Sequence, residues 1–556
     1  MLKWYYQETN DQGESWEVFQ ACHSMSRQLK AQRTLTWVPD EYGSYFPSKN
    51  TSDALVDGYI RTFETVYRIL HIPTFKRDYE SLWERPSSMA GALVIKTQLC
   101  LAIGACLYDD TFSFRSHALQ WIREAESWLD SSHGSQTAIS SVQIMCLLVL
   151  ALQNVQTSSS ERTSSRCGAL LRSAMVIDLH RDPAKLPPMS VAEAEIRRRL
   201  WTTILELVLD CSLDTGLPPL ISLKDFDCAL SRNFNDTDLN FNAKNDLNPR
   251  SEDELTDTTL QRILGDSVAT RLSITQHANG IKDVDYEEVL RLHTEFTTAY
   301  RSLAASLQSL SPGVSQFQRQ YCEMLMSRYV FSLHIPYIPS ARENLMLHFS
   351  RAICVEAAVR LLHSSTTLLP TREPSLVAIQ EMMVLMPRCD DHARLALCGN
   401  GPFRKTHFQA MMVVAEELCS LLGGSYNADL PSTTASTGHQ MSDLRCVEML
   451  SLLRSAAEWV KLRVKACQDN FGEFVFVLAL LANVEAIRDG TSPEESVART
   501  GKRAWLEAKQ ILTQLRDESL SLLDFDISRD HGLGMSTDFL TIPMSESEWE
   551  ESLPFY

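Results

Sequence analysis

One cluster of acidic, histidine and cysteine residues has the side chains that bind metals. Asp390, Asp391 and His392 follow one another, and Cys389 and Cys398 flank them. Carboxylate, imidazole and thiolate groups are the usual ligands of zinc and related metals. The surrounding stretch, PRCDDHAR, is polar and breaks a helix pattern, and the cysteine spacing matches no standard zinc site. We therefore interpret the cluster as a solvated loop.

Two further histidines, His71 and His334, share the fragment LHIP. In each copy a proline follows that cannot continue a helix, so a structural place at a helix end is expected for both. The sequence contains no H-E-x-x-H, no G-x-S-x-G and no glycine loop that would cradle a phosphate. We predict no catalytic, cofactor-binding or metal-ligating residue, and we expect that the protein is not an enzyme.

Three consecutive arginines in the stretch EAEIRRRLW are candidates for a nucleic-acid contact or a nuclear-import signal. Ser190 and Glu193 have the spacing of a capping box, so a helix is expected to begin at about Val191. Trp201 widens its apolar face, and Gly216, followed by two prolines, is expected to end it. The arginines therefore belong to the first turns of an amphipathic helix.

Two glutamates balance the charge of these arginines. Glu193 lies four residues before Arg197, and Glu195 lies four residues before Arg199. Exposed pairs of this kind contribute ~0.2–0.5 kcal/mol each to helix stability. We therefore place the arginines on the outer face of a helix, where neutralising Arg197 or Arg199 alone is expected to matter little.

The charge and composition of the whole chain exclude several classes of protein. The net charge is -18 over 556 residues, whereas a DNA-binding surface needs a basic face. None of the 14 cysteines forms a C-x-x-C pair. The chain opens without an apolar signal core, and its longest apolar runs, residues 144–152 and 474–482, are about half a membrane span. We predict neither secretion nor a membrane segment.

The elements that would position these residues are helices. Apolar residues recur at steps of three and four, with no alternating strand pattern, so the fold class is predicted to be all-α. The first helix is expected to begin at Ser52 and to stop at Pro73, and another is expected at 374–386. Polar stretches predict long loops at 230–254 and 423–442. The expected organisation is an N-terminal segment of uncertain fold (1–51), one large helical domain (52–516) and a flexible acidic tail (517–556).

The tail combines acidic and aromatic residues. From Asp517 to Tyr556 there are ten acidic residues and one basic residue, Arg529. This alternation is typical of disordered activation segments, in which charge repulsion keeps aromatic groups exposed for a coactivator groove. An ordinary acidic tail is the alternative. The candidate activation anchors are Phe525, Phe539, Trp549 and Phe555.

The block from Met175 to Asp236 resembles the signature of the fungal-specific transcription factor domain. That domain is the middle homology region of fungal binuclear zinc-cluster regulators. Segments 56–75, 332–340 and 350–358 resemble its flanking helices, so the resemblance covers about residues 52–360, with the signature block at about 163–236. The residues that match are His180, Arg181, Asp182, Pro183, Glu195, Arg198, Arg199, Leu200, Trp201, Asp210, Gly216, Pro218, Asp225, Asp227, Asn235 and Asp236.

The resemblance implies a large all-α regulatory domain that controls transcription by RNA polymerase II in the nucleus of a fungus. An effector or partner would restrain or expose the acidic tail, and the tail would bind a coactivator or the transcription machinery. The matched residues are then a structural signature of the domain. Members of this family carry a dimerising coiled coil, so a homodimer is a further expectation, and no membrane partner is expected.

The residues before the domain cannot form the zinc cluster of this family. About fifty residues precede it, and their single cysteine, Cys22, cannot build a binuclear cluster. We therefore expect no cofactor in this chain and contact with promoter DNA only through a missing module or a partner protein. Either the regulator has no cluster, or a first exon is missing from the sequence. The alternative function is a helical enzyme or small-molecule-binding protein without a recognisable motif.

Overall fold

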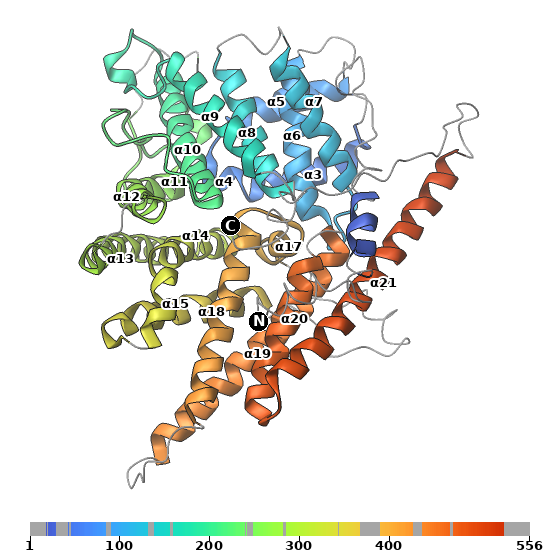
Figure 1. The fold of residues 1–556 in the computed structure, drawn as a ribbon. Helices are drawn as coiled ribbons and strands as arrows, with labels where there is room; N and C mark the ends of the chain where they lie inside the picture. Colours follow the sequence, from blue (N-terminus) through green and yellow to red (C-terminus); the bar gives the residue numbers. More distant parts are fainter. Residues whose placement is uncertain are drawn as a thin grey trace. The chain divides into compact units, whose positions relative to one another are not determined.

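The computed structural model describes fourteen stretches of the chain, and all their regular secondary structure is helical (Figure 1). These described residues contain no β-strand, which confirms the predicted all-α class. The chain forms two compact units, one of residues Thr36–Val413 and one that joins Met1–Leu35 to Val414–Tyr556. The described residues are 18, 20–28, 43, 46–84, 91–131, 138–155, 160–239, 241, 248–281, 285–342, 344–366, 390–425, 436–467 and 471–527.

The larger unit opens with helices packed around one apolar helix, α6. Helix α6 is in contact with α3, α7 and α8, and helix α9 with α8 and α10. By length and composition α6 could cross a membrane, but 72% of it is buried inside the structure, as in the core helix of a folded domain. The helices of this part are α3 (Lys49–Arg61), α4 (Glu64–Tyr67), α5 (Ile72–Glu84), α6 (Gly91–Tyr108), α7 (Arg115–Asp130), α8 (Ile139–Val155), α9 (Ser160–Val176) and α10 (Val191–Thr215).

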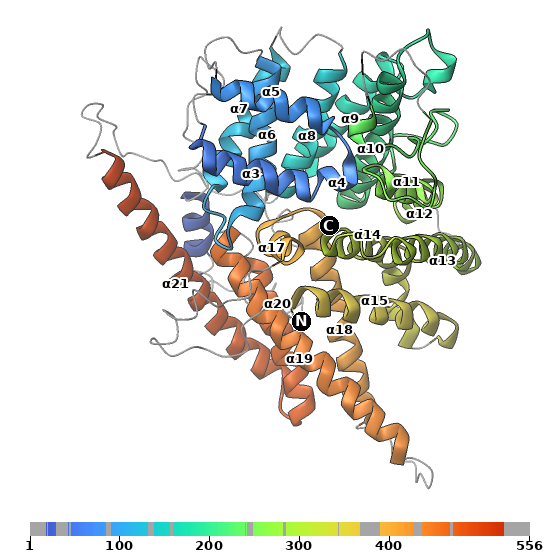
Figure 2. The same ribbon diagram turned by 180° about the vertical axis from the view of Figure 1, so that it is seen from behind.

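The remainder of this unit packs on helix α14. Figure 2 shows α13 and α14 running side by side, and α14 is also in contact with α12 and α15. The buried face of α14 includes Tyr321, Arg328 and Tyr329. The helices are α11 (Thr259–Gly265), α12 (Val268–Ala278), α13 (Tyr286–Ser309), α14 (Gln316–His334), α15 (His348–Thr366), α17 (Asp391–Cys398) and the first half of α18 (Pro402–Ser425).

The smaller unit contains the long helices α19 (Ser436–Cys467), α20 (Phe471–Asp489) and α21 (Pro493–Ile527), of which α20 packs against the other two. Residues 20–28 form a helix that belongs to this unit. Cys22 is fully buried and its thiol faces the backbone carbonyl of Trp505 at 3.8 Å. Residues 20–28 of the N-terminal segment, for which the sequence suggested no fold, therefore belong to the same unit as the C-terminal helices.

Several helix boundaries differ from the sequence-based prediction. The first predicted helix is broken into α3 and α4, and Pro73 lies in the first turn of α5 instead of stopping the preceding helix. Proline is tolerated there because first-turn amides have no partner within the helix. Helices α18 and α19 extend into the predicted loop at 423–442, and α21 continues eleven residues into the predicted tail, through Ile527. The helix predicted at 374–386 lies outside the described residues.

Candidate functional site

The helix that carries the three arginines begins and ends as the sequence predicts. The Ser190 backbone amide donates to the Glu193 carboxylate at 2.9 Å, and the Glu193 amide donates to the Ser190 hydroxyl at 3.2 Å. This reciprocal pair is the predicted capping box at the start of α10. Gly216 follows the helix in the left-handed conformation, with φ of 68°, as a C-terminal cap requires. Trp201 is 1% exposed, so its ring belongs to the core.

The arginines do not lie on an outer face, and this part of the prediction is wrong. Arg199 is 0% exposed, and its guanidinium donates to Asp236 at 2.5 Å. Glu193 is engaged with the cap, and Glu195 bonds Arg198 and Arg232, so neither predicted i,i+4 pair forms.

Arg197 is half-buried and donates to a backbone carbonyl, that of Ile177. The local pattern of the helix could not show this, because the partners come from distant segments.

Asp236 is the centre of a buried charge cluster. It accepts hydrogen bonds from Arg199, from Arg68 at 2.6 Å and from the Ile72 amide at 2.8 Å. His71 bonds its backbone carbonyl at 2.8 Å. Burial acts to raise the pKa of Asp236, but the two arginines outweigh it and hold this pKa below its ordinary range. The carboxylate therefore stays charged and neutralises arginines from two helical segments.

A second cluster joins α10 to the segments on either side of it. Arg198 donates to Asp182 at 2.9 Å and to Glu195 at 2.8 Å. Glu195 is 0% exposed and also accepts from the Arg232 side chain at 2.7 Å and from its backbone amide at 2.8 Å. Burial would raise the pKa of Asp182, but hydrogen bonds from Arg198 and the amides of Ala184 and Ala229 lower it to about 2. Asp182 is therefore ionised at neutral pH.

A third cluster connects α10 with α14. Arg328 donates to Asp210 at 2.5 Å and to Asp214 at 2.7 Å. The Tyr67 hydroxyl lies 3.1 Å from Asp210 and 2.7 Å from the Tyr321 hydroxyl. Burial raises the pKa of Asp210 to about 6, against the opposing charge of Arg328. The cluster fixes the position of α14 along α10.

One further ion pair in this region was missed by the sequence analysis. Arg271 of α12 donates to both carboxylate oxygens of Glu206 at 2.5 and 2.6 Å, and Arg271 is 0% exposed. A glutamate inside the apolar run ILELVLD of α10 was the available signal, because such a position is charged only when a partner is present. Together these clusters make a largely buried scaffold, in which the side chain of Arg232 is partly exposed.

The structure brings most of the predicted signature residues together. His180, Asp182, Pro183, Glu195, Arg198 and Trp201 gather where the segment before α10 and the segment after it meet. The His180 carbonyl accepts the amides of Asp227 and Cys228 at 3.0 and 3.1 Å, and its ring lies 6.1 Å from that of Trp201. Arg199 and Asp210 belong to the other two clusters, while Arg181, Gly216 and Pro218 are exposed.

The polar sequence around Asp390 is not a solvated loop, contrary to prediction. Asp390 caps helix α17 by accepting the Ala393 amide at 2.7 Å, and Asp391 pairs with Arg61 at 2.9 Å. His392 is 0% exposed, with its ring centroid 5.7 Å from that of Phe403, and burial lowers its pKa to about 4. The three side chains point to different partners.

Among the described residues, no group of three or more His, Cys, Asp or Glu side chains could hold a metal ion. The buried thiol of Cys22 faces a backbone carbonyl, so it does not fit a ligand of the zinc cluster that the family implies.

The two histidines of the LHIP fragments have structural partners. His71 lies between the Thr74 hydroxyl and the Asp236 carbonyl, each at 2.8 Å. His334 is fully buried at the end of α14, 2.8 Å from the Ser350 hydroxyl and 2.9 Å from the ring of His293. Neither histidine belongs to a group of three or more possible metal ligands among the described residues.

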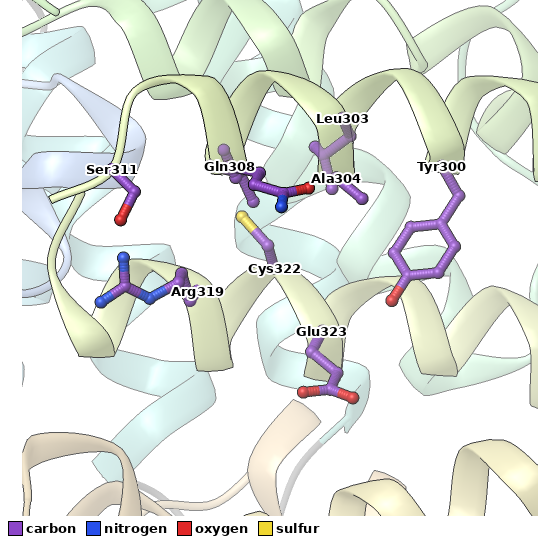
Figure 3. Close-up of a pocket in the computed structure, with 9 residues that line it drawn as sticks. Tyr300, Leu303, Ala304, Gln308, Ser311, Arg319, Cys322 and Glu323 are labelled. Carbon is purple, nitrogen blue, oxygen red and sulfur yellow. The ribbon is translucent and has the colours of Figure 1, made fainter. Parts of the chain in front are cut away.

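One pocket in the larger unit lies between α13 and α14 (Figure 3). Its volume is about 370 Å³, near the lower end of the range for small-molecule sites. The buried floor consists of Leu303, Leu307 and Cys322. The rim consists of Tyr300, Ala304, Gln308, Ser311, Arg319 and Glu323.

The predicted activation anchors lie at or beyond the end of the described chain. Phe525 belongs to the last turns of helix α21. Phe539, Trp549 and Phe555 are outside the described residues.

The described residues of this unit form a helical domain that is held by buried ion pairs around α10. Residues 56–322 match the model of the family described as the fungal specific transcription factor domain. The match confirms the resemblance seen in the sequence: this part of the chain is similar to the domain that these fungal transcription factors contain. As predicted, this is a class of transcription regulators and not of enzymes.

Curated relatives are fungal transcription factors. The chain is 30% identical to transcription factor lepE of Aspergillus flavus over 86% of this chain and 57% of the relative. It is 29% identical to transcription factor opdR of Penicillium oxalicum, over 96% of this chain and 70% of the relative.

A match of 26% identity to the Zn(2)-C6 fungal-type transcription factor mpsB of Macrophomina phaseolina covers 59% of this chain and 46% of the relative. The chain thus spans about half the length of two of these relatives. No solved structure matches the chain.

Proposed function

We propose that this chain is the regulatory part of a protein that controls transcription by RNA polymerase II in a fungal nucleus. The observation that carries the proposal is the match of residues 56–322 to the fungal specific transcription factor domain. With a net charge of -18, the chain itself is a poor surface for duplex DNA. Promoter DNA would be contacted through a zinc-cluster module outside this sequence or through a partner protein.

The signature residues are proposed to act as the scaffold of this domain. Asp182 and Asp236 each bind an arginine of α10, and Asp210 binds Arg328 of α14. These contacts tie the segments before and after α10, and α14 itself, to one helix. The role supported by this arrangement is to keep a single domain geometry on which an effector or a partner can act.

The acidic tail is proposed to supply the output by binding a coactivator or the transcription machinery. Acids interleaved with aromatic groups remain unpacked in water and order only when they dock, so a few aromatic anchors provide the affinity. Phe525 lies within helix α21, whereas Phe539, Trp549 and Phe555 lie outside the described residues. The last three are the stronger candidates for docking.

A tethered reporter tests this proposal. The full chain, fused to an unrelated DNA-binding domain in a fungal host, is expected to activate the reporter, whereas a fusion that ends at Ile527 is expected to be silent at equal protein levels. Alanine at Phe539, Trp549 and Phe555 together should abolish activation, and alanine at Phe525 should not. If the fusion ending at Ile527 activates as strongly as the full chain, the tail is not the output segment.

Two further measurements address the partners of the chain. A fluorescence-anisotropy titration of the purified chain should show DNA binding no tighter than ~10⁻⁴–10⁻⁶ M at physiological salt, the range of non-specific contacts. Tight, sequence-selective binding would show that the chain reads DNA by itself. Light scattering at several concentrations tests the homodimer, which predicts twice the monomer mass of 62.8 kDa.

A further inference from the structure

The pocket between α13 and α14 has an apolar floor and a polar rim. Leu303 and Leu307 of α13 and Cys322 of α14 form the floor, and they are 2%, 8% and 1% exposed. Burial raises the pKa of the Cys322 thiol to about 12, so this sulfur is neutral and unreactive at physiological pH. The floor therefore offers apolar contact to a bound molecule and no nucleophile.

The hollow follows from the side chains that α13 presents at this place. Tyr300, Ala304 and Gln308 recur at four-residue steps and so lie along one face of the helix. From Tyr300 to Gln308 the face is ~12 Å long, at 1.5 Å per residue. Ala304 in the middle is small and exposed, and it leaves open the space above Leu303 and Leu307. A chain or ring of several carbon atoms fits such a space.

The two charged groups of the rim differ in their partners. Glu323 lies 3.5 Å from the guanidinium of Arg360, which also binds Glu356 at 3.0 Å. The side chain of Arg319 has no ion pair or hydrogen bond with any described residue, although it lies one turn before Glu323 on α14. In Figure 3 its guanidinium lies at the opposite end of the pocket from Tyr300, near the hydroxyl of Ser311. The pocket thus has one uncompensated cation at one end.

We propose that this pocket binds a small organic acid with an apolar body. The carboxylate would take the fork of donors on Arg319, with the Ser311 hydroxyl as a further donor, in the charge-assisted geometry that guanidinium groups favour. The apolar body would lie over Leu303, Leu307 and Cys322 and end at the ring of Tyr300. The ion pair of Glu323 with Arg360 prevents that carboxylate from repelling the ligand strongly. A ligand at this site would be a small-molecule effector of the helical domain. The proposed binding does not depend on whether the acidic tail activates transcription.

Calorimetric titration of the full chain with octanoate tests the proposal, with octylamine and octanol as probes of the same length and different charge. Octanoate is expected to bind saturably at one site and to bind more tightly than either control. Replacing Arg319 with Gln should weaken octanoate binding roughly tenfold to a hundredfold, the loss expected for hydrogen bonds to a charged group. Arg301→Gln changes an exposed arginine of α13 outside the pocket and should leave binding unchanged.

A second variant tests the pocket through its volume instead of through the charge of Arg319. Ala304→Trp should fill the hollow from an exposed position and abolish octanoate binding without lowering the melting temperature. The proposal is overturned if Arg319→Gln and Arg301→Gln bind octanoate equally, or if Ala304→Trp retains full binding. Tighter binding of octylamine would likewise overturn it, because it would assign the pocket to cations at Glu323.

Discussion

Replacing Asp236 with asparagine should destabilise the larger unit more than any other single isosteric change in its polar clusters. Asp236 is 3% exposed and is the carboxylate shared by Arg68 and Arg199, which are 4% and 0% exposed. Asparagine keeps the shape of the side chain and can accept one hydrogen bond, but it removes the negative charge that both guanidinium groups contact.

The expected loss follows from the cost of a buried charge without its partner. Removing one member of a buried ion pair costs ~3–5 kcal/mol, mainly because the other member stays charged and desolvated. Here two arginines are left, and Nε and Nη2 of Arg199 have no other hydrogen-bond partner. We therefore expect Asp236→Asn to lower the free energy of unfolding by at least ~3–5 kcal/mol. Adding Arg199→Met to this variant should recover part of the loss, because one uncompensated charge is then removed.

Hydrogen exchange of the α10 amides, with thermal unfolding of the same samples, measures the stability of this unit separately from the other. Asp253→Asn is the matched control, because Asp253 lies in the same connecting segment, is exposed and forms no ion pair. It should change stability within ±0.5 kcal/mol or so. The reasoning is refuted if Asp236→Asn and Asp253→Asn behave alike. It is also refuted if Arg199→Met adds its own full loss instead of restoring stability.

Three further perturbations test other parts of the same unit. Ser190→Ala removes the capping hydroxyl and should lower the free energy of unfolding by ~0.5–2 kcal/mol in a urea titration. Trp201→Ala should cost ~3–5 kcal/mol in the same assay, because the ring is in the core. His392 has its pKa lowered by burial to about 4, below the ordinary 6.5, so the unfolded state binds more protons and stability falls as pH drops through 6.5 toward 4. His392→Leu should remove about 2 kcal/mol of the loss between pH 7 and pH 5, and an unchanged pH profile would show that this histidine is solvated.

The features of α10 that the sequence predicted correctly are all local. The capping box joins residues three apart, the left-handed position of Gly216 is a property of one residue, and the burial of Trp201 follows from a helical pattern. Each depends on interactions within a few residues, so the sequence alone contains the information.

The ionic partners could not be predicted in this way. Asp236 is 37 residues from Arg199 and 168 from Arg68, and Asp210 is 118 from Arg328. A helical pattern with nearby glutamates suggests exposed arginines because i,i+4 pairs are the usual partners on a surface. The family signature did contain both Arg199 and Asp236, and opposite charges within one structural signature were the available hint of a pair.

The cluster at Asp390 was misinterpreted for a different reason, because here a local signal was present in the sequence but was obscured by polarity. Its polar residues indicated a loop, yet Asp390 is an N-cap and the residues after it form helix α17 with His392 inside. An aspartate followed by the pattern of RLALC was a capping signal that polarity obscured. The aromatic anchors after Ile527 depend on composition alone, so the activation segment stays a prediction.

Helix α14 is where the scaffold and the pocket meet. Arg328 fixes α14 to Asp210 and Asp214 of α10, and Arg319 and Cys322, which lie earlier on the same helix by roughly two turns, line the pocket. A ligand that draws Arg319 toward α13 therefore acts on a helix whose other end is held by a buried ion pair. Because a packed helix moves as a rigid element, strain at one end reaches the other without rearrangement between them. Asp210 and Asp214 of α10 would then hold α14 in its position in the absence of ligand, and an effector would have to move α14 away from that position.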